Sequence, residues 1–91
     1  MVGTSLPDQF ARALANMLTA LTAAGGTPAD LARVTVYVTD VAACRASAPE
    51  LGRVRRESAG RDHPAMAVVG IVRLWDEEAL VELDGFVVLG G

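Results

Sequence analysis

The change in hydrophobic spacing along the first half of the chain constrains the fold more than any other feature. Six apolar residues recur at helical spacing, namely Phe10, Ala13, Leu14, Met17, Leu18 and Leu21. Such a stripe is the buried side of an amphipathic α-helix. Between residues 33 and 39 the spacing becomes two, because Val34, Val36 and Val38 alternate with Arg33, Thr35, Tyr37 and Thr39. This alternation predicts a half-buried strand, so a helix should pack on one face of a sheet.

Local signals set the bounds of the first helix. Ser5 and Asp8 have the spacing of an N-terminal cap, and Pro7 lies in the first turn, where its missing N–H costs nothing. Gly25 and Gly26 follow the last apolar position, and glycine closes helices because it tolerates positive φ. Residues 27–30 repeat the start signal, but the strand pattern begins so soon afterwards that only a short turn fits between them.

A second helical stretch follows the strand and has two possible starts. Asp40 is a suitable N-cap, so a helix could begin at Val41 and kink near Pro49. Alternatively, the Ser47 to Glu50 capping signal could start a helix over residues 48–59, with a short turn before it. Both alternatives place one helical element between the first strand and the next.

The segment 45–61 is rich in arginine, with five Arg against Glu50 and Glu57. On a helix, Leu51 and Val54 should face the core, and Arg53, Arg55 and Arg56 should face outward. The segment is therefore either a solvated helix face or a local site for an anion or partner.

The last third of the chain is typical of β-structure. Residues 60–63 read as a loop, residues 64–74 and 79–89 as strands, and residues 75–78 as the hairpin turn between them. The resulting order of helix, strand, helix, strand, strand predicts an α+β fold, with two helices packed on one face of a mixed sheet. Three strands make a thin sheet whose edges are open to pairing.

Length and composition bound the molecule as a whole. The 91 residues fit a single domain over 1–91. Hydrophobic residues make up 52% of the chain but aromatic residues only 4%, and so short a chain cannot bury all of them. We therefore expect a homo-oligomer with an apolar interface.

Charge and cysteine content exclude several classes of partner. The net charge of −3 disfavours nucleic acid, and no run of apolar residues is long enough to span a membrane. Cys44 is the single cysteine, so it can form no internal disulfide, which suits the cytoplasm. With His63 as the single histidine, the chain does not offer the ligands of a zinc site, and we expect no metal.

Glu82 and Asp84 are the carboxylates that could carry chemistry. They lie two residues apart on a predicted strand and share the face opposite Val81 and Leu83. Their own face also includes Leu80, Phe86 and Val88. Carboxylates in such surroundings can position or activate water. The alternative is that both point into solvent or pair with an arginine across an interface.

Five segments in order resemble the reactive intermediate deaminase family, also known as RidA or YjgF-like proteins. They are residues 10–16 (FARALAN), 21–26 (LTAAGG), 30–40 (DLARVTVYVTD), 64–66 (PAM) and 81–85 (VELDG). The resemblance implies a chorismate-mutase-like α+β fold whose N-terminal strands are missing from this chain. It also implies a homotrimer with its sheets facing inward and ligand clefts between subunits.

The function implied by the resemblance is hydrolysis of small reactive imines and enamines without a cofactor. Glu82 corresponds to the family glutamate that orients water, and Ala65, Met66, Ala67 and Asp84 fall at substrate-binding positions. Met66 stands where the family has an arginine that holds the substrate carboxylate, and methionine cannot donate to that group. Two hypotheses remain open: a RidA-like enzyme for a differently anchored small metabolite, or a non-catalytic binding or assembly module.

Overall fold

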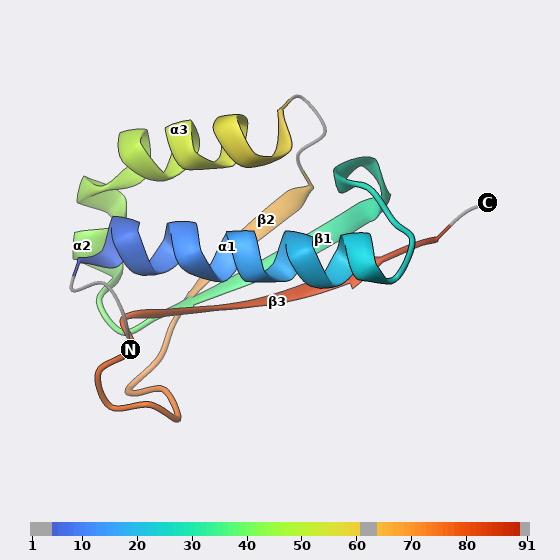
Figure 1. Ribbon diagram of the computed structural model, residues 1–91. Helices are drawn as coiled ribbons and strands as arrows, with labels where there is room; N and C mark the ends of the chain where they lie inside the picture. Colours follow the sequence, from blue (N-terminus) through green and yellow to red (C-terminus); the bar gives the residue numbers. More distant parts are fainter. Residues whose placement is uncertain (1–4, 61–63, 90–91) are drawn as a thin grey trace.

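The computed structural model describes residues 5–60 and 64–89 as helices packed on one face of a sheet (Figure 1). The order of elements is α1 (Leu6–Ala23), a 3-10 turn η1 (Pro28–Asp30), β1 (Leu31–Val38), α2 (Val41–Ala46), α3 (Ala48–Ala59), β2 (Ala65–Gly70) and β3 (Val81–Val87). The predicted α+β class and mixed sheet are confirmed. No helix of the described ranges is both long enough and apolar enough to cross a bilayer.

The start and end of α1 follow the predicted signals. The Asp8 N–H donates to the Ser5 hydroxyl at 3.2 Å, which caps the first turn. The helix ends at Ala23, and Gly25 takes φ of 88°, in the left-handed region that favours glycine. The short turn predicted after it is η1, where the Asp30 carboxylate accepts from the Thr27 N–H at 2.8 Å.

The region after β1 combines the two predicted starts. Asp40 caps α2, accepting a hydrogen bond from the Ala43 N–H at 3.0 Å. This helix covers only Val41–Ala46, and α3 begins one residue later, with Pro49 in its first turn. Ser47 lies between the two helices, but its side chain makes no capping hydrogen bond. Proline therefore separates two helices here, because it cannot donate to the turn before it.

The strand order is β2-β1-β3, which corrects the predicted hairpin between the last two strands. β2 runs parallel to β1, and β3 runs antiparallel to it on the other side. The central position suits β1, because its valines Val34, Val36 and Val38 are almost fully buried. The long connection 71–80 carries the chain past β1 to its far edge.

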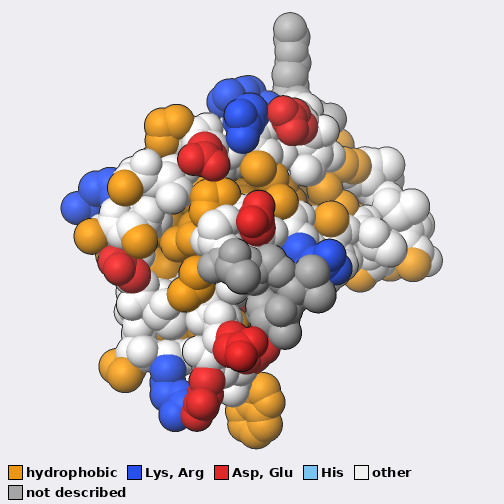
Figure 2. Space-filling view, turned by 60° about the vertical axis from the view of Figure 1, so that its left-hand side comes forward, with side chains coloured by type: hydrophobic (Ala, Val, Ile, Leu, Met, Phe, Trp, Pro, Cys, Tyr) orange, Lys and Arg blue, Asp and Glu red, His pale blue; other side chains and the backbone are white. Residues whose placement is uncertain are grey.

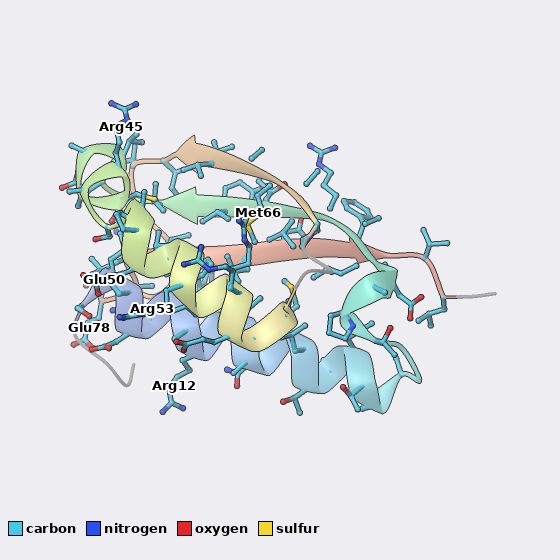
Figure 3. The ribbon with its side chains drawn as sticks, turned by 90° about the horizontal axis from the view of Figure 1, so that it is seen from above. Arg12, Arg45, Glu50, Arg53, Met66 and Glu78 are labelled. Atoms are coloured by element: carbon cyan, nitrogen blue, oxygen red, sulfur yellow. The ribbon has the colours of Figure 1, made fainter. Side chains whose placement is uncertain are left out.

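The hydrophobic core lies between the sheet and α1, with Leu14, Val34 and Val38 as its most buried side chains. Seen from above, the helices occupy one layer and the strands the other (Figure 3). No described element covers the outer face of the sheet, which we call the open face.

Candidate functional site

Glu82 and Asp84 lie on the open face of the sheet, as their alternation with Val81 and Leu83 predicts. Glu82 is the cross-strand neighbour of Tyr37, and Asp84 is the neighbour of Thr35. Both carboxylates are exposed, whereas Val81 is buried and Leu83 packs against the core. The two acids therefore meet solvent, or whatever covers this face, rather than the helices.

Two of the other predicted site residues share this face. Ala67 pairs with Thr35 and Ala65 pairs with Arg33, so β2 places both alanines on the same side as the carboxylates. Arg33 adds a positive charge beside them. Sequence analysis did not identify it, although its place in the β1 alternation put it on this face.

The open face is also strongly apolar. Phe86 is 61% exposed and Val88 is 70% exposed, and Val69 is exposed as well. Leu80 was expected on the same face, but it packs against the core because β3 begins only at Val81. In the space-filling view, which shows another side of the molecule, hydrophobic side chains reach the surface in patches between the charged ones (Figure 2).

Met66 lies on the opposite side of the sheet from the other predicted site residues. Its partner in β1 is Val34, and its side chain packs against the core. Within one chain, therefore, the strand pleat separates Met66 from Glu82. The single chain brings together Glu82, Asp84, Ala65 and Ala67 but leaves Met66 out.

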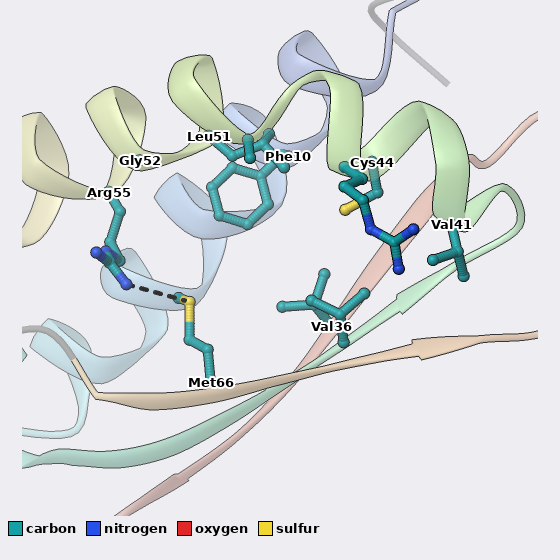
Figure 4. Close-up of a pocket in the computed structure, with 11 residues that line it drawn as sticks. Phe10, Val36, Val41, Cys44, Leu51, Gly52, Arg55 and Met66 are labelled. Carbon is teal, nitrogen blue, oxygen red and sulfur yellow. Dashed lines mark hydrogen bonds between the residues drawn. The ribbon is translucent and has the colours of Figure 1, made fainter.

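A groove on the helix side of the sheet begins at Met66, and we call it the α2–α3 groove. Its volume is about 410 Å³, and it is lined by Phe10, Val36, Val41, Cys44, Arg45, Ala48, Leu51, Gly52, Arg55, Met66 and Val68. Arg55 was expected to face outward with its neighbours, and that expectation is wrong. It lies one turn after Leu51 on the same side of α3, is half-buried, and directs Nη1 toward the Met66 sulfur at 4.0 Å (Figure 4).

This contact changes what an arginine at position 66 would do. Met66→Arg places a second guanidinium beside Arg55, and two like charges about 4 Å apart repel by roughly 1 kcal/mol even in water. We expect Met66→Arg to lower the free energy of unfolding by about 1–2 kcal/mol at low salt, as measured by urea denaturation.

The control is Met66→Leu, which keeps the volume and should cost less than about 1 kcal/mol. Added salt should reduce the difference in the free energy of unfolding between the two variants, because it screens the repulsion between the two guanidinium groups. A Met66→Arg protein as stable as the leucine variant at low salt would contradict the placement of Arg55.

A second groove, which we call the α1–β3 groove, runs between α1 and the free edge of β3. It has a volume of about 550 Å³ and is lined by Ala13, Asn16, Met17, Ala20, Leu74, Trp75, Asp76, Ala79, Val81, Glu82 and Leu83. Glu82 thus borders both the open face and this groove. Asn16 also lines this groove. It lies one turn before Ala20 on the same side of α1, and this spacing could have predicted that the two residues line the same groove.

Gln9 holds the loop that forms one wall of the α1–β3 groove, and sequence analysis missed it. It is 4% exposed on α1. Its side-chain oxygen accepts from the Leu80 N–H at 2.7 Å, and its Nε2 donates to the Glu78 carbonyl at 3.2 Å. The sequence did contain a sign of its role, because Gln9 is a polar residue one turn after Leu6 on the otherwise apolar side of the helix.

The remaining candidate groups have no shared site. Burial raises the pKa of the Cys44 thiol, which disfavours the reactive thiolate. Within residues 5–60 and 64–89, no cluster of three His, Cys, Asp or Glu side chains could hold a metal ion. His63 lies outside the described residues.

The chain matches one protein family over most of its length. The model of that family, described as endoribonuclease L-PSP, matches residues 1–89. None of the curated proteins matches the chain.

Several solved structures have a similar fold. A YjgF-family protein from Mycobacterium tuberculosis is 32% identical over 91% of this chain and 67% of its own, with a TM-score of 0.78. A Rid-family protein from Yersinia pestis is 30% identical over 96% of this chain and 65% of its own, with a TM-score of 0.81. RidA from an Antarctic Psychrobacter is 21% identical over 98% of this chain and 68% of its own, with a TM-score of 0.81, and shows the fold alone. The chain thus spans about two thirds of the length of these structures.

Proposed function

Because the chain belongs to the endoribonuclease L-PSP family, which includes the YjgF and RidA proteins, we propose that it binds small reactive imines or enamines in a cleft between subunits. In that cleft Glu82 orients the water that hydrolyses them. The observation that carries the proposal is the place of Glu82, exposed on an uncovered sheet face beside Asp84 and Tyr37.

The separation of Met66 from Glu82 favours a cleft built by two copies. The α2–α3 groove includes Met66 and Val68 of β2, an edge strand, and Val68 is 52% exposed. A neighbouring copy seated against that edge would bring its own open face to the groove. Closed rings of identical subunits are built from such contacts, and we propose a homotrimer with the open faces turned inward.

The chemistry requires little from the protein, because the carbon of an imine is already electrophilic. The Glu82 carboxylate accepts a hydrogen bond from water and takes its proton as the oxygen attacks that carbon. Glu82 passes this proton to the nitrogen, which gives a carbinolamine. The hydroxyl proton of the carbinolamine then moves to the nitrogen, with Glu82 as the relay, as the carbon–nitrogen bond breaks and the carbonyl forms. The nitrogen leaves as ammonia or an amine. No cofactor takes part in this sequence.

Substitution of Glu82 tests the hydrolysis. Glu82→Gln keeps the shape of the side chain but cannot take a proton, so we expect a loss of about 100-fold or more in the rate of imine hydrolysis. The assay should compare a neutral imine with one that carries a carboxylate.

Glu57→Gln makes the same change at an exposed position on α3 and is the matched control, so its rate should stay within about twofold of the unmodified protein. Hydrolysis that does not depend on Glu82 with either substrate would contradict the proposed mechanism.

A non-catalytic assembly module is the second candidate function. The exposure of Phe86 and Val88 favours it, because an apolar open face drives association whether or not chemistry follows. Stable oligomers of the Glu82→Gln protein, together with no hydrolysis by the unmodified protein, are the outcome this candidate predicts.

RNA cleavage, which the family description names, has less support in this chain. The net charge is −3, and the open face presents Glu82 and Asp84 against Arg33. A phosphate backbone is attracted by clustered positive charge and repelled by carboxylates. We therefore do not propose an RNA substrate.

A further inference from the structure

The α2–α3 groove differs in charge from the rest of this acidic protein. Of the described residues that line it, Arg45 and Arg55 are positive and none is acidic. By contrast, Arg53 on α3 lies within 4.0 Å of Glu57, and Arg73 lies within 3.0 Å of Glu77. The groove therefore combines positive charge with no neutralising carboxylate among its described lining residues.

The Arg55 guanidinium has poor protein partners. Nη1 approaches the Met66 sulfur at 4.0 Å, and a thioether is a weak acceptor. Nε is shielded from solvent and has no hydrogen-bond partner among the described residues. Because buried polar groups are nearly always hydrogen-bonded, this half-buried cation is suited to an acceptor that enters the groove from outside.

The polarity of the groove walls limits which kind of ligand could bring a hydrogen-bond acceptor to Arg55. Val36 and Met66 on the strands face Phe10 and Leu51 on the helices, and all four are apolar (Figure 4). The volume of about 410 Å³ is in the range of small-molecule pockets. Arg45 is exposed to solvent, whereas Arg55 is half-buried. The Arg55 guanidinium neutralises one negative charge, and its planar fork matches the two oxygens of a carboxylate.

We propose that the α2–α3 groove binds a small carboxylate with an apolar tail, and that Arg55 holds the carboxylate. Arg55 thereby supplies, from a different element, a guanidinium next to the position that Met66 leaves uncharged. This inference concerns equilibrium binding by the chain and needs no turnover, so it stands or falls separately from hydrolysis by Glu82.

Binding of hexanoate to the full chain tests the proposal, followed by amide chemical shifts in NMR spectra. The unmodified protein should show saturable shifts at residues that line the groove. Arg55→Gln should weaken binding by at least about tenfold, because a charged hydrogen-bond pair is lost. Arg53→Gln removes the same charge from the solvent side of α3 and should change affinity by less than about twofold.

Further measurements separate the effect of the ligand's charge, the effect of the guanidinium geometry and any effect of the substitution on folding. Hexanol should bind the unmodified protein and Arg55→Gln with equal affinity, because it has no charge to lose. Arg55→Lys should bind hexanoate with intermediate affinity, and its thermal unfolding should show that the fold is intact. The proposal is overturned by the absence of saturable shifts, by equal losses in Arg53→Gln and Arg55→Gln, or by tighter binding of hexyl phosphate than of hexanoate.

Discussion

Replacing Ala67 with glutamate is expected to abolish self-association. Ala67 lies on the open face, midway along the edge strand β2, and pairs with Thr35, whose other neighbour across the sheet is Asp84. In the proposed oligomer each copy would bury an added carboxylate near an existing one. An unpaired charge in an interface costs at least about 3 kcal/mol, and a ring of identical subunits incurs that cost at every interface.

Sedimentation velocity at micromolar concentration checks this result. The unmodified protein should sediment as an oligomer, and Ala67→Glu as a species near the 9.5 kDa mass of one chain. Ala15→Glu is the matched control, because Ala15 is an exposed position on α1, on the other side of the molecule from the open face. A monomeric Ala15→Glu protein, or an oligomeric Ala67→Glu protein, would place the interface elsewhere.

Gln9→Met is expected to cause the largest loss of stability among the substitutions considered. Methionine keeps the length of the side chain but leaves the Leu80 N–H and the Glu78 carbonyl without the partner they have now. Unsatisfied groups of this kind cost about 1–3 kcal/mol each. We expect a loss of about 2–4 kcal/mol, a large fraction of the total stability of a small domain.

Thermal unfolding followed by circular dichroism measures this effect. A loss of that size should lower the Tm by roughly 10–20 °C in a domain of this length. Arg12→Met is the control on the same helix, since Arg12 is exposed and points away from the sheet (Figure 3). If the two variants have the same Tm, Gln9 contributes little to holding the loop that lines the α1–β3 groove.

The elements could be predicted from the sequence because their signals are local. Ser5 and Asp40 cap helices through side chains three residues from their partners, and the β1 valines alternate without interruption. The pairing of strands could not be predicted in the same way. A turn at residues 75–78 is compatible with a hairpin between β2 and β3. In the structure both strands instead pair with β1, one at each of its edges, which buries the valines of β1 in the centre of the sheet.

The sequence predicted which site residues share a face of a strand, but not which side chains from different elements meet. Alternation alone placed Glu82 and Asp84 together, opposite Val81. Arg55 was not predictable by the rule that charged residues face outward, because an arginine can bury its carbon chain and still present its charge in a groove. The place of Gln9 on the apolar side of α1 could be predicted, but its hydrogen-bond partners could not, because they lie about 70 residues away and no local pattern contains them.

The central place of β1 also dictates an order of assembly during synthesis. Both of its partners come later in the chain, β2 at residues 65–70 and β3 at residues 81–87, so no pair of strands in this sheet is local in sequence. Contacts of this kind close long loops and slow the search for the native state. While the ribosome translates residues 39–80, the emerging valine-rich strand has at most one of its two edges paired. Strand β1 therefore stays exposed to chaperones and to aggregation until β3 has been made.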